Sequence, residues 1–114
     1  MIKWVLKAYE PDEIVLSLSV TDNGLFAVIT FKHYSYSEIT STGYVDIGIE
    51  KDRMYFREGT DCTGYKLVGT VTGSRRVHTS KEKITDFIEN RVGQYRLCKD
   101  ESNGFFYIDT KKGD

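Results

Sequence analysis

The chain has 114 residues, of which 39% are hydrophobic and 29% are charged, a balance typical of a folded domain rather than of a disordered segment. The 16 basic residues nearly match the 17 acidic ones, and the formal net charge is -1. This balance excludes a whole-molecule electrostatic attraction to nucleic acid or anionic lipid, and it equally excludes an acidic mimic of nucleic acid. We therefore expect one domain over residues 1–114, with charge-driven binding confined to a local patch.

Targeting and redox signals favour a cytoplasmic protein. The first seven residues, MIKWVLK, lack the apolar core of a signal peptide, and no stretch approaches the ~20 apolar residues of a membrane span. We therefore expect no membrane association and expect Cys62 and Cys98 to remain thiols, although their spacing leaves a disulfide open. Two isolated cysteines and two histidines do not form a zinc motif, so we expect no metal and no other cofactor.

Alternation of apolar and polar residues dominates the first third of the chain and predicts strands over residues 2–8, 14–20 and 25–31. Asn23-Gly24 favours the positive φ values of a type I′ turn, which predicts a tight hairpin between the last two strands. The expected core face carries Ile14, Leu16, Leu18, Val20, Leu25, Ala27, Ile29 and Phe31. Phe26 and Val28 are apolar on the other face, so we expect that face to be partly covered.

The middle of the chain continues the same pattern with more interruptions. Residues 33–43 are polar and β-branched, which fits either an extended strand or a long loop. Alternation returns over residues 45–49 and 53–57, on either side of a short turn at Lys51-Asp52. Residues 59–64 form a glycine-bounded loop, and residues 65–71 read as a strand in which Gly69 marks a bulge or an edge.

One helix is predicted, over about residues 80–92. Its core-facing stripe consists of Ile84, Phe87, Ile88 and Val92. Thr79 and Glu82 have the spacing of a capping box, Arg91 falls in the last turn, and Gly93 suits the C′ position.

The chain closes with two further strand patterns, over residues 94–99 and 105–110, around a turn at residues 102–104. Short hairpin-type connections favour antiparallel pairing, because parallel strands need crossovers of a dozen or more residues. The predicted fold is mainly β (α+β): a curled or barrel-like antiparallel sheet of about eight strands. The single helix packs late, on one face of the sheet or into one end.

A basic stretch is the first candidate site. Arg75, Arg76, His78, Lys81 and Lys83 gather around the expected helix start, where free N–H groups and the helix dipole favour anions. A phosphate or a nucleic-acid backbone would fit there. Alternatively, the arginines alternate outward on a strand, and Thr79 with Glu82 already satisfies the helix start. The stretch does not match a P-loop.

A tyrosine-bearing segment is the second candidate. Lys32, Tyr34 and Tyr36 share one face of an extended strand, where aromatic rings next to a cation can stack on bases or anchor a protein interface. Tyr9, Tyr44 and Tyr55 could extend this surface. Alternatively, these tyrosines are ordinary strand residues, half-buried with wet hydroxyls.

Catalysis is not indicated. The motifs G-x-S-x-G and H-E-x-x-H are absent from the sequence, and the spacing of Cys62 from His33 and His78 does not suggest a nucleophile–base pair. Self-association is a further option, since residues 45–49 or 105–109 could pair across a homodimer unless lysine, glutamate and glycine blunt those edges.

These patterns favour a small, non-enzymatic binding protein that acts on a protein or nucleoprotein partner. The expected working surface combines the basic helix start with the tyrosine-bearing strand. By analogy, such a domain suits an accessory or inhibitor protein of a phage or another mobile element. The alternative is a nucleic-acid-binding or small-anion-binding (nucleotide-binding) domain that uses residues 73–83.

Overall fold

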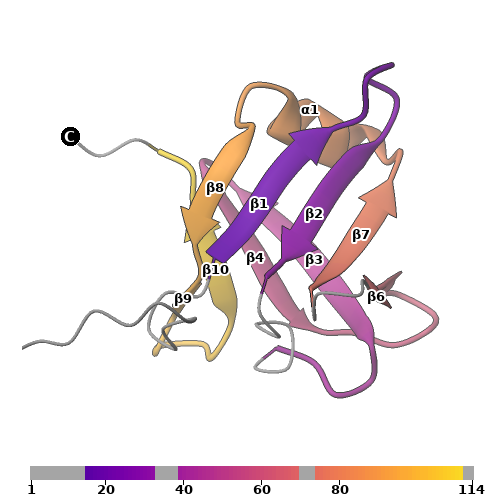
Figure 1. Cartoon of the computed structure of the whole chain (residues 1–114). Helices are drawn as coiled ribbons and strands as arrows, with labels where there is room; N and C mark the ends of the chain where they lie inside the picture. The colour runs from indigo at the N-terminus through magenta and orange to yellow at the C-terminus, as the bar shows by residue number, and fades with distance from the viewer. Residues whose placement is uncertain (1–14, 33–38, 70–73, 112–114) are drawn as a thin grey trace, which may run out of the picture.

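The computed structural model describes residues 15–32, 39–69 and 74–111. These residues form two five-stranded antiparallel sheets, which face each other, and one helix (Figure 1). Sheet A contains, in spatial order, β6 (Val68–Gly69), β7 (Arg75–Thr79), β2 (Ala27–Phe31), β1 (Val15–Val20) and β8 (Gly93–Arg96). Sheet B contains β5 (Tyr65–Lys66), β3 (Tyr44–Glu50), β4 (Arg53–Glu58), β10 (Phe106–Asp109) and β9 (Cys98–Lys99).

Besides the longer connection from β2 of sheet A to β3 of sheet B, the chain passes between the two sheets at two single leucines. Leu67 separates β5 of sheet B from β6 of sheet A, and Leu97 separates β8 of sheet A from β9 of sheet B. Both leucines are buried, so each turns its side chain into the interior where the chain leaves one ladder for the other. The mainly β, antiparallel class is confirmed. The expectation of one curled or barrel-like sheet of about eight strands is wrong in detail, because the ladders are interrupted and the sheets do not close into a barrel.

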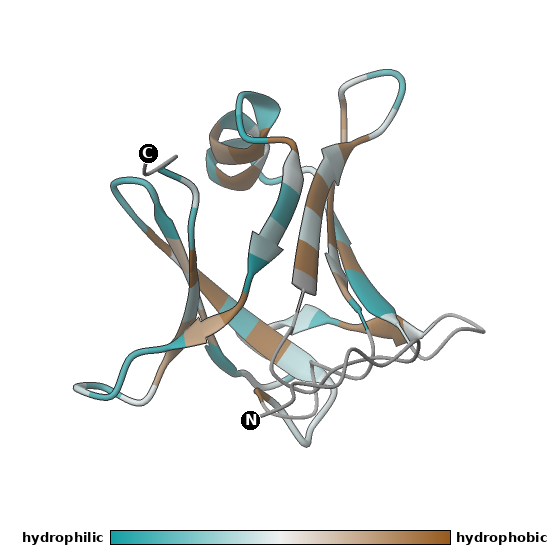
Figure 2. Cartoon of the chain, turned by 60° about the vertical axis from the view of Figure 1, so that its left-hand side comes forward, coloured by the Kyte–Doolittle hydropathy of each residue, from teal (hydrophilic) through white to brown (hydrophobic). Residues whose placement is uncertain are grey.

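The core lies between the sheets and follows the predicted alternation. Leu16 and Leu18 of β1 and Ile29 and Phe31 of β2 are fully or almost fully buried. Figure 2 shows the resulting apolar bands, which alternate with polar ones along the strands. The Phe31 ring meets the Phe56 ring of sheet B edge to face, with centroids 5.2 Å apart and planes 80° apart. This aromatic contact joins the two sheets directly.

The first hairpin has the expected register partners but not the expected turn. Val20 pairs with Ala27, and the Thr21 N–H donates to the Phe26 carbonyl across a wider loop (3.0 Å). A type I′ turn requires a positive φ at both central residues. Gly24 meets this requirement, with a φ of +71°. Asn23 does not, because Lys51 is the only non-glycine residue of the described ranges with a positive φ. In this wider loop Leu25 is 63% exposed and leaves the predicted core, and Phe26 is also exposed.

The hairpin predicted at Lys51-Asp52 is confirmed, whereas the closing hairpin is confirmed only next to its turn, because Gly93–Arg96 pairs with β1 of sheet A instead of with β10. Glu50 pairs with Arg53 across Lys51-Asp52, and Phe106 pairs with Lys99 in the closing hairpin. Residues 59–64 form a loop. The strand expected over residues 2–8 lies outside the described residues, as does most of the segment 33–43.

The helix, α1, spans Glu82–Glu89 and buries Ile84, Phe87 and Ile88 as predicted. The capping box is wrong: Lys81 is the N-cap residue, and no side chain caps the helix. Thr79 is instead the last residue of β7, where it is buried and its hydroxyl oxygen accepts the Lys81 N–H (3.1 Å).

The predicted C-terminal half-turn of the helix is also wrong. Asn90 ends the helix, so Arg91 and Val92 follow it, and Val92 is 55% exposed rather than part of the core stripe. Gly93 starts β8 instead of occupying C′. A periodicity of 3.6 residues does not indicate where a helix must end so that the chain can enter the next strand. The predicted apolar stripe of the helix therefore extends too far.

The helix connects β7 to β8 across one end of the sandwich and packs against β1 and β2 (Figure 1). Arg91 fastens this end. Its guanidinium donates to the Phe87 carbonyl (3.0 Å), to the Thr110 hydroxyl (3.0 Å) and to Asp52 (3.1 Å), and it lies 4.4 Å from the centre of the Phe87 ring. One side chain therefore links the helix to the β3–β4 turn and to the residue after β10.

Candidate functional site

The strands of sheet A carry no carboxylate. They contain Arg75, Arg76, His78 and Arg96 but neither aspartate nor glutamate, whereas the strands of sheet B contain Asp46, Glu50, Glu58 and Asp109. The overall charge of -1 thus hides a separation of charge between the two sheets. Any local attraction for anions is therefore strongest over sheet A.

The outer side of sheet A is built from the residues that alternate with the core. The register places Gln94, Ser17, Thr30, Arg76 and Val68 in one row across all five strands. A second row contains Ser19, Val28 and His78. We define the basic face as the polar members of this side together with Lys32, which follows β2 in the same alternation: Ser17, Ser19, Thr30, Lys32, Arg76, His78, Gln94 and Arg96.

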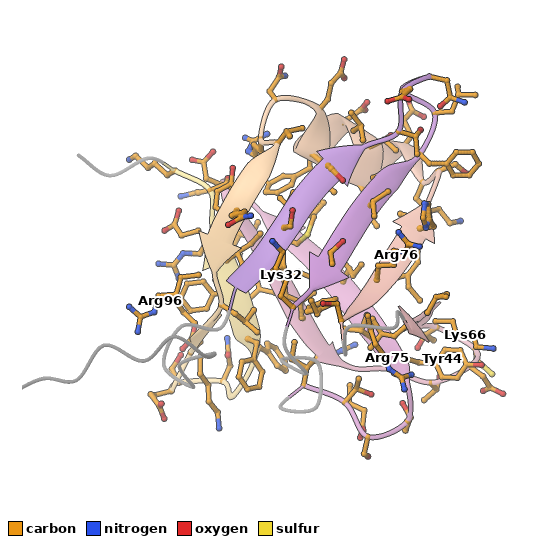
Figure 3. The ribbon with its side chains drawn as sticks, viewed as in Figure 1. Lys32, Tyr44, Lys66, Arg75, Arg76 and Arg96 are labelled. Carbon is orange, nitrogen blue, oxygen red and sulfur yellow. The ribbon has the colours of Figure 1, made fainter. Side chains whose placement is uncertain are left out.

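The basic face has small side chains in its middle and long ones at its sides. Ser17, Ser19 and Thr30 lie on β1 and β2, the central strands, while Arg76 and Arg96 lie on β7 and β8 at the flanks. Neighbouring strands are about 4.8 Å apart, so β7 and β8 are separated by roughly 14 Å. The result is a floor of hydroxyl groups bordered by cationic side chains; Figure 3 shows Lys32, Arg76 and Arg96 distributed over this sheet.

The structure brings together three of the predicted site residues and separates others. Lys32, Arg76 and His78 share the outer side of sheet A. Arg75 alternates with them: it has the parity of Val77 and Thr79, which face the interior, and it is only half-exposed. Arg75 therefore does not belong to the basic face, although it is adjacent to Arg76 in sequence (Figure 3).

Of the remaining predicted residues, those that the structure describes do not lie on this face. Lys81 and Lys83 are exposed, but they lie beyond the end of β7, at the start of α1. Tyr34 and Tyr36 lie outside the described residues, as does Tyr9. Tyr44 and Tyr55 belong to β3 and β4 of sheet B, so neither lies on the basic face.

The cations of the two sheets differ in their partners. Arg53 pairs with Asp109 (3.4 Å) and Arg57 with Asp46 (3.1 Å), both on sheet B. Arg53 also donates to the Tyr55 hydroxyl, a contact that raises the arginine pKa and keeps the guanidinium charged. By contrast, Lys32, Arg76 and His78 form no ion pair within the described part of the chain. These three side chains are available to an external anion.

Several members of the basic face were not identified as site residues from the sequence. None of the five residues Ser17, Ser19, Thr30, Gln94 and Arg96 belongs to a candidate site predicted from the sequence. Alternation could have placed all five on one side of a sheet. The spatial order of the strands, which makes the hydroxyls central and the cations peripheral, depends on long-range pairing.

No other site chemistry is assembled within the described ranges. There, no group of three or more histidine, cysteine, aspartate or glutamate residues could hold a metal ion. Cys62 is an exposed free thiol and Cys98 a half-buried one on β9. In the same ranges no helix has the length and hydropathy needed to cross a bilayer. Comparison with known proteins matches no family model, no curated protein and no solved structure.

Proposed function

We propose that this chain is a non-enzymatic binding protein that docks a nucleic-acid strand on the basic face of sheet A. The observation that carries the proposal is the absence of carboxylates from all five strands of that sheet, combined with its row of hydroxyl, amide and guanidinium donors. The partner is thus a macromolecule, and the working surface is an extended face rather than an enclosed cavity.

The donor types match a phosphate backbone. Arginine and lysine contact phosphate oxygens together with serine, threonine and glutamine side chains, and such contacts position a nucleic acid without reading its sequence. Hydroxyl groups at Ser17, Ser19 and Thr30 let a strand approach the sheet closely, and Arg76 and Lys32 neutralise its charge. A single strand fits the roughly 14 Å between the flanking strands better than an intact duplex does.

The basic face is small, so we expect weak and salt-sensitive binding. Three to four neutralised phosphates on a single strand give a slope of roughly -2 to -3 in a plot of log affinity against log salt. A double Lys32→Ala/Arg76→Ala variant removes about two of these contacts. Its slope should flatten by about 1.4, with affinity falling at least tenfold at low salt.

The experiment is fluorescence anisotropy of labelled oligothymidylate and oligouridylate over a range of salt concentrations. The matched control is the double Lys99→Ala/Lys111→Ala variant, which removes the same charge away from sheet A and should leave both affinity and slope unchanged. A duplex of equal length tests the preference for a single strand.

Two results would contradict the proposal. Equal losses in the two double variants would show that net charge alone drives binding. Tight binding of poly-glutamate with the same dependence on Arg76 would instead point to the acidic surface of a protein, the other partner class indicated by the sequence. A role in a phage or another mobile element stays a prediction, which identification of the source cell's bound partners would test.

A further inference from the structure

Among the residues that the structure describes, none pairs with the outer edge of β3 over most of its length. β3 pairs with β4 from Val45 to Glu50, but on its other side β5 reaches only Tyr44 and Val45. The Tyr44 carbonyl accepts the Gly59 N–H, so alternate residues from Tyr44 onward direct their main-chain groups toward β4. Ile47 and Ile49 therefore direct theirs outward, and no residue of the described ranges pairs with them there.

A hollow lies next to this edge on the outer side of sheet B. Gly48 faces that side opposite Tyr55, and a Cβ atom added at Gly48 would come no closer than 3.9 Å to its nearest neighbour. A space of about 480 Å³ is lined by Gly48, Ile49, Glu50, Tyr55, Asp100, Asn103 and Phe105. Because Gly48 has no side chain, its backbone forms the floor of this space. The β9–β10 turn forms the opposite wall.

The lining combines aromatic rings with carboxylates. Tyr55 and Phe105 supply apolar surface, while Glu50 and Asp100 supply negative charge. The Ser102 hydroxyl and main-chain N–H both donate to Asp100 (2.6 and 2.9 Å), and these bonds lower the pKa of the Asp100 carboxyl, so it stays ionised at neutral pH.

The cations near the hollow are already engaged. Arg57 pairs with Asp46 and lies 5.8 Å from the centre of the Phe105 ring, and Arg53 pairs with Asp109. No described cation forms an ion pair with Glu50 or Asp100. Arg53 acts on Asp100 only from a distance, as one of the causes that lower its pKa. The combination of aromatic walls and two carboxylates without an ion-pair partner among the described residues suits an alkyl chain that ends in a cation, as in lysine or arginine.

We propose that the β3 edge and this hollow together bind an extended, basic peptide segment of a partner protein. The segment adds to sheet B as a strand and hydrogen-bonds to Ile47 and Ile49. Its residue opposite Gly48 is a lysine or arginine that enters the hollow. Strand addition of this kind obtains affinity from main-chain bonds and specificity from pockets for alternate side chains.

A second copy of the chain fits this edge less well. Antiparallel pairing of two β3 strands about Gly48 would leave the hollow empty, because glycine has no side chain to insert. It would also set Asp46 opposite Glu50 of the other copy, and like charges in that position destabilise a sheet. The inference concerns the opposite sheet from the basic face, so it does not rest on the proposed function.

Binding of a labelled peptide to the intact protein tests the proposal. The probe alternates threonine and valine around a central lysine, and its affinity is measured by fluorescence anisotropy at moderate salt. Replacing the lysine by norleucine should weaken binding at least fivefold and replacing it by glutamate at least twentyfold. N-methylation of the valine amides, which removes the main-chain donors, should abolish binding to the unaltered protein.

Two protein variants locate the site. Gly48→Leu fills the hollow and should weaken lysine-peptide binding at least tenfold, while Glu50→Gln should weaken it about threefold. Retained thermal unfolding cooperativity verifies that each variant folds. The proposal is overturned if the lysine peptide does not bind, if the glutamate peptide binds equally well, or if Gly48→Leu leaves affinity unchanged. A concentration-dependent dimer that Gly48→Leu disrupts would overturn it in favour of a second copy.

Discussion

Sheets A and B contribute alike to the interior, yet their outer surfaces are opposites. Leu16, Leu18 and Phe31 of sheet A meet Met54, Phe56 and Ile108 of sheet B in one core, and all are almost completely buried. Outside, sheet A presents donors without any strand carboxylate, whereas sheet B presents carboxylates and arginines that pair with each other. The sheets share their packing but not their electrostatics.

This difference shows why average composition is a poor guide to binding. A net charge near zero results here from one basic surface and one mixed surface, not from uniform mixing. An approaching anion experiences mainly the nearest charges, because salt at physiological concentration largely screens charges more than about 8 Å away. The two outer surfaces can therefore serve different partners independently.

The largest expected effect comes from the interior that the sheets share. Phe31→Ala removes the ring that contacts Phe56 across the core and leaves a cavity, which should lower the free energy of unfolding by about 4 kcal/mol. Phe26→Ala is the matched control on an exposed loop and should cost less than about 0.5 kcal/mol. Urea denaturation measures both, and equal costs would contradict this assignment of the core.

The next effect concerns the end at which Arg91 joins the helix on sheet A to the turn of sheet B. Arg91→Ala breaks its bonds to Asp52, Thr110 and the Phe87 carbonyl and should cost about 2–3 kcal/mol. Arg57→Ala removes a more exposed ion pair and should cost less than about 1 kcal/mol. If thermal unfolding shows a similar loss of stability for the two variants, Arg91 does not stabilise the contact between the helix and sheet B more than a surface ion pair would.

A carboxylate placed on sheet A tests the electrostatic contrast directly. Thr30→Glu puts a negative charge in the middle of the basic face, so it should weaken oligonucleotide binding at least tenfold, or about 1.4 kcal/mol. Its stability should change little, because Thr30 faces outward and is half-exposed. Asn103→Glu adds the same charge on the side of sheet B. If it weakens binding equally, the contrast between the sheets has no role.

The smallest effect is the acid sensitivity of sheet B. The Ser41 N–H and hydroxyl donate to Glu58 (2.6 and 2.8 Å), and these bonds lower the pKa of the Glu58 carboxyl. A lowered folded-state pKa contributes stability that is present above the ordinary glutamate value of about 4.3 and is lost as pH falls further. Glu58→Gln should therefore flatten the fall in stability below about pH 4.3, whereas Glu101→Gln should not, as urea titrations at several pH values would show.

The sequence predicts the strands well where one side of a strand is buried. Alternation correctly places Leu16, Leu18, Ile29 and Phe31 inside, because a period of two directly reflects a sheet with one covered side. The breaks at Leu67 and Leu97 could not be predicted in this way, since both residues continue their local patterns. Only pairing with distant strands decides which sheet each half-strand joins.

The candidate site was predictable in part for the same reason. Alternation is enough to place Arg76 and His78 on one side of a strand and Arg75 on the other, whereas the predicted basic stretch groups all three. The capping box failed because Thr79 is needed as a buried strand residue, a tertiary demand that overrides local helix signals. The hollow at Gly48 depends on the β9–β10 turn, which is more than fifty residues away in sequence.

The crossings at Leu67 and Leu97 also affect how the molecule folds. Because only one residue separates the two ladders at each of these places, we expect the two sheets to unfold together rather than as separate foldons. A nick next to Cys62 would leave two fragments, each holding strands of both sheets but completing neither. Such fragments should remain unstructured when separate and regain cooperative structure only when mixed.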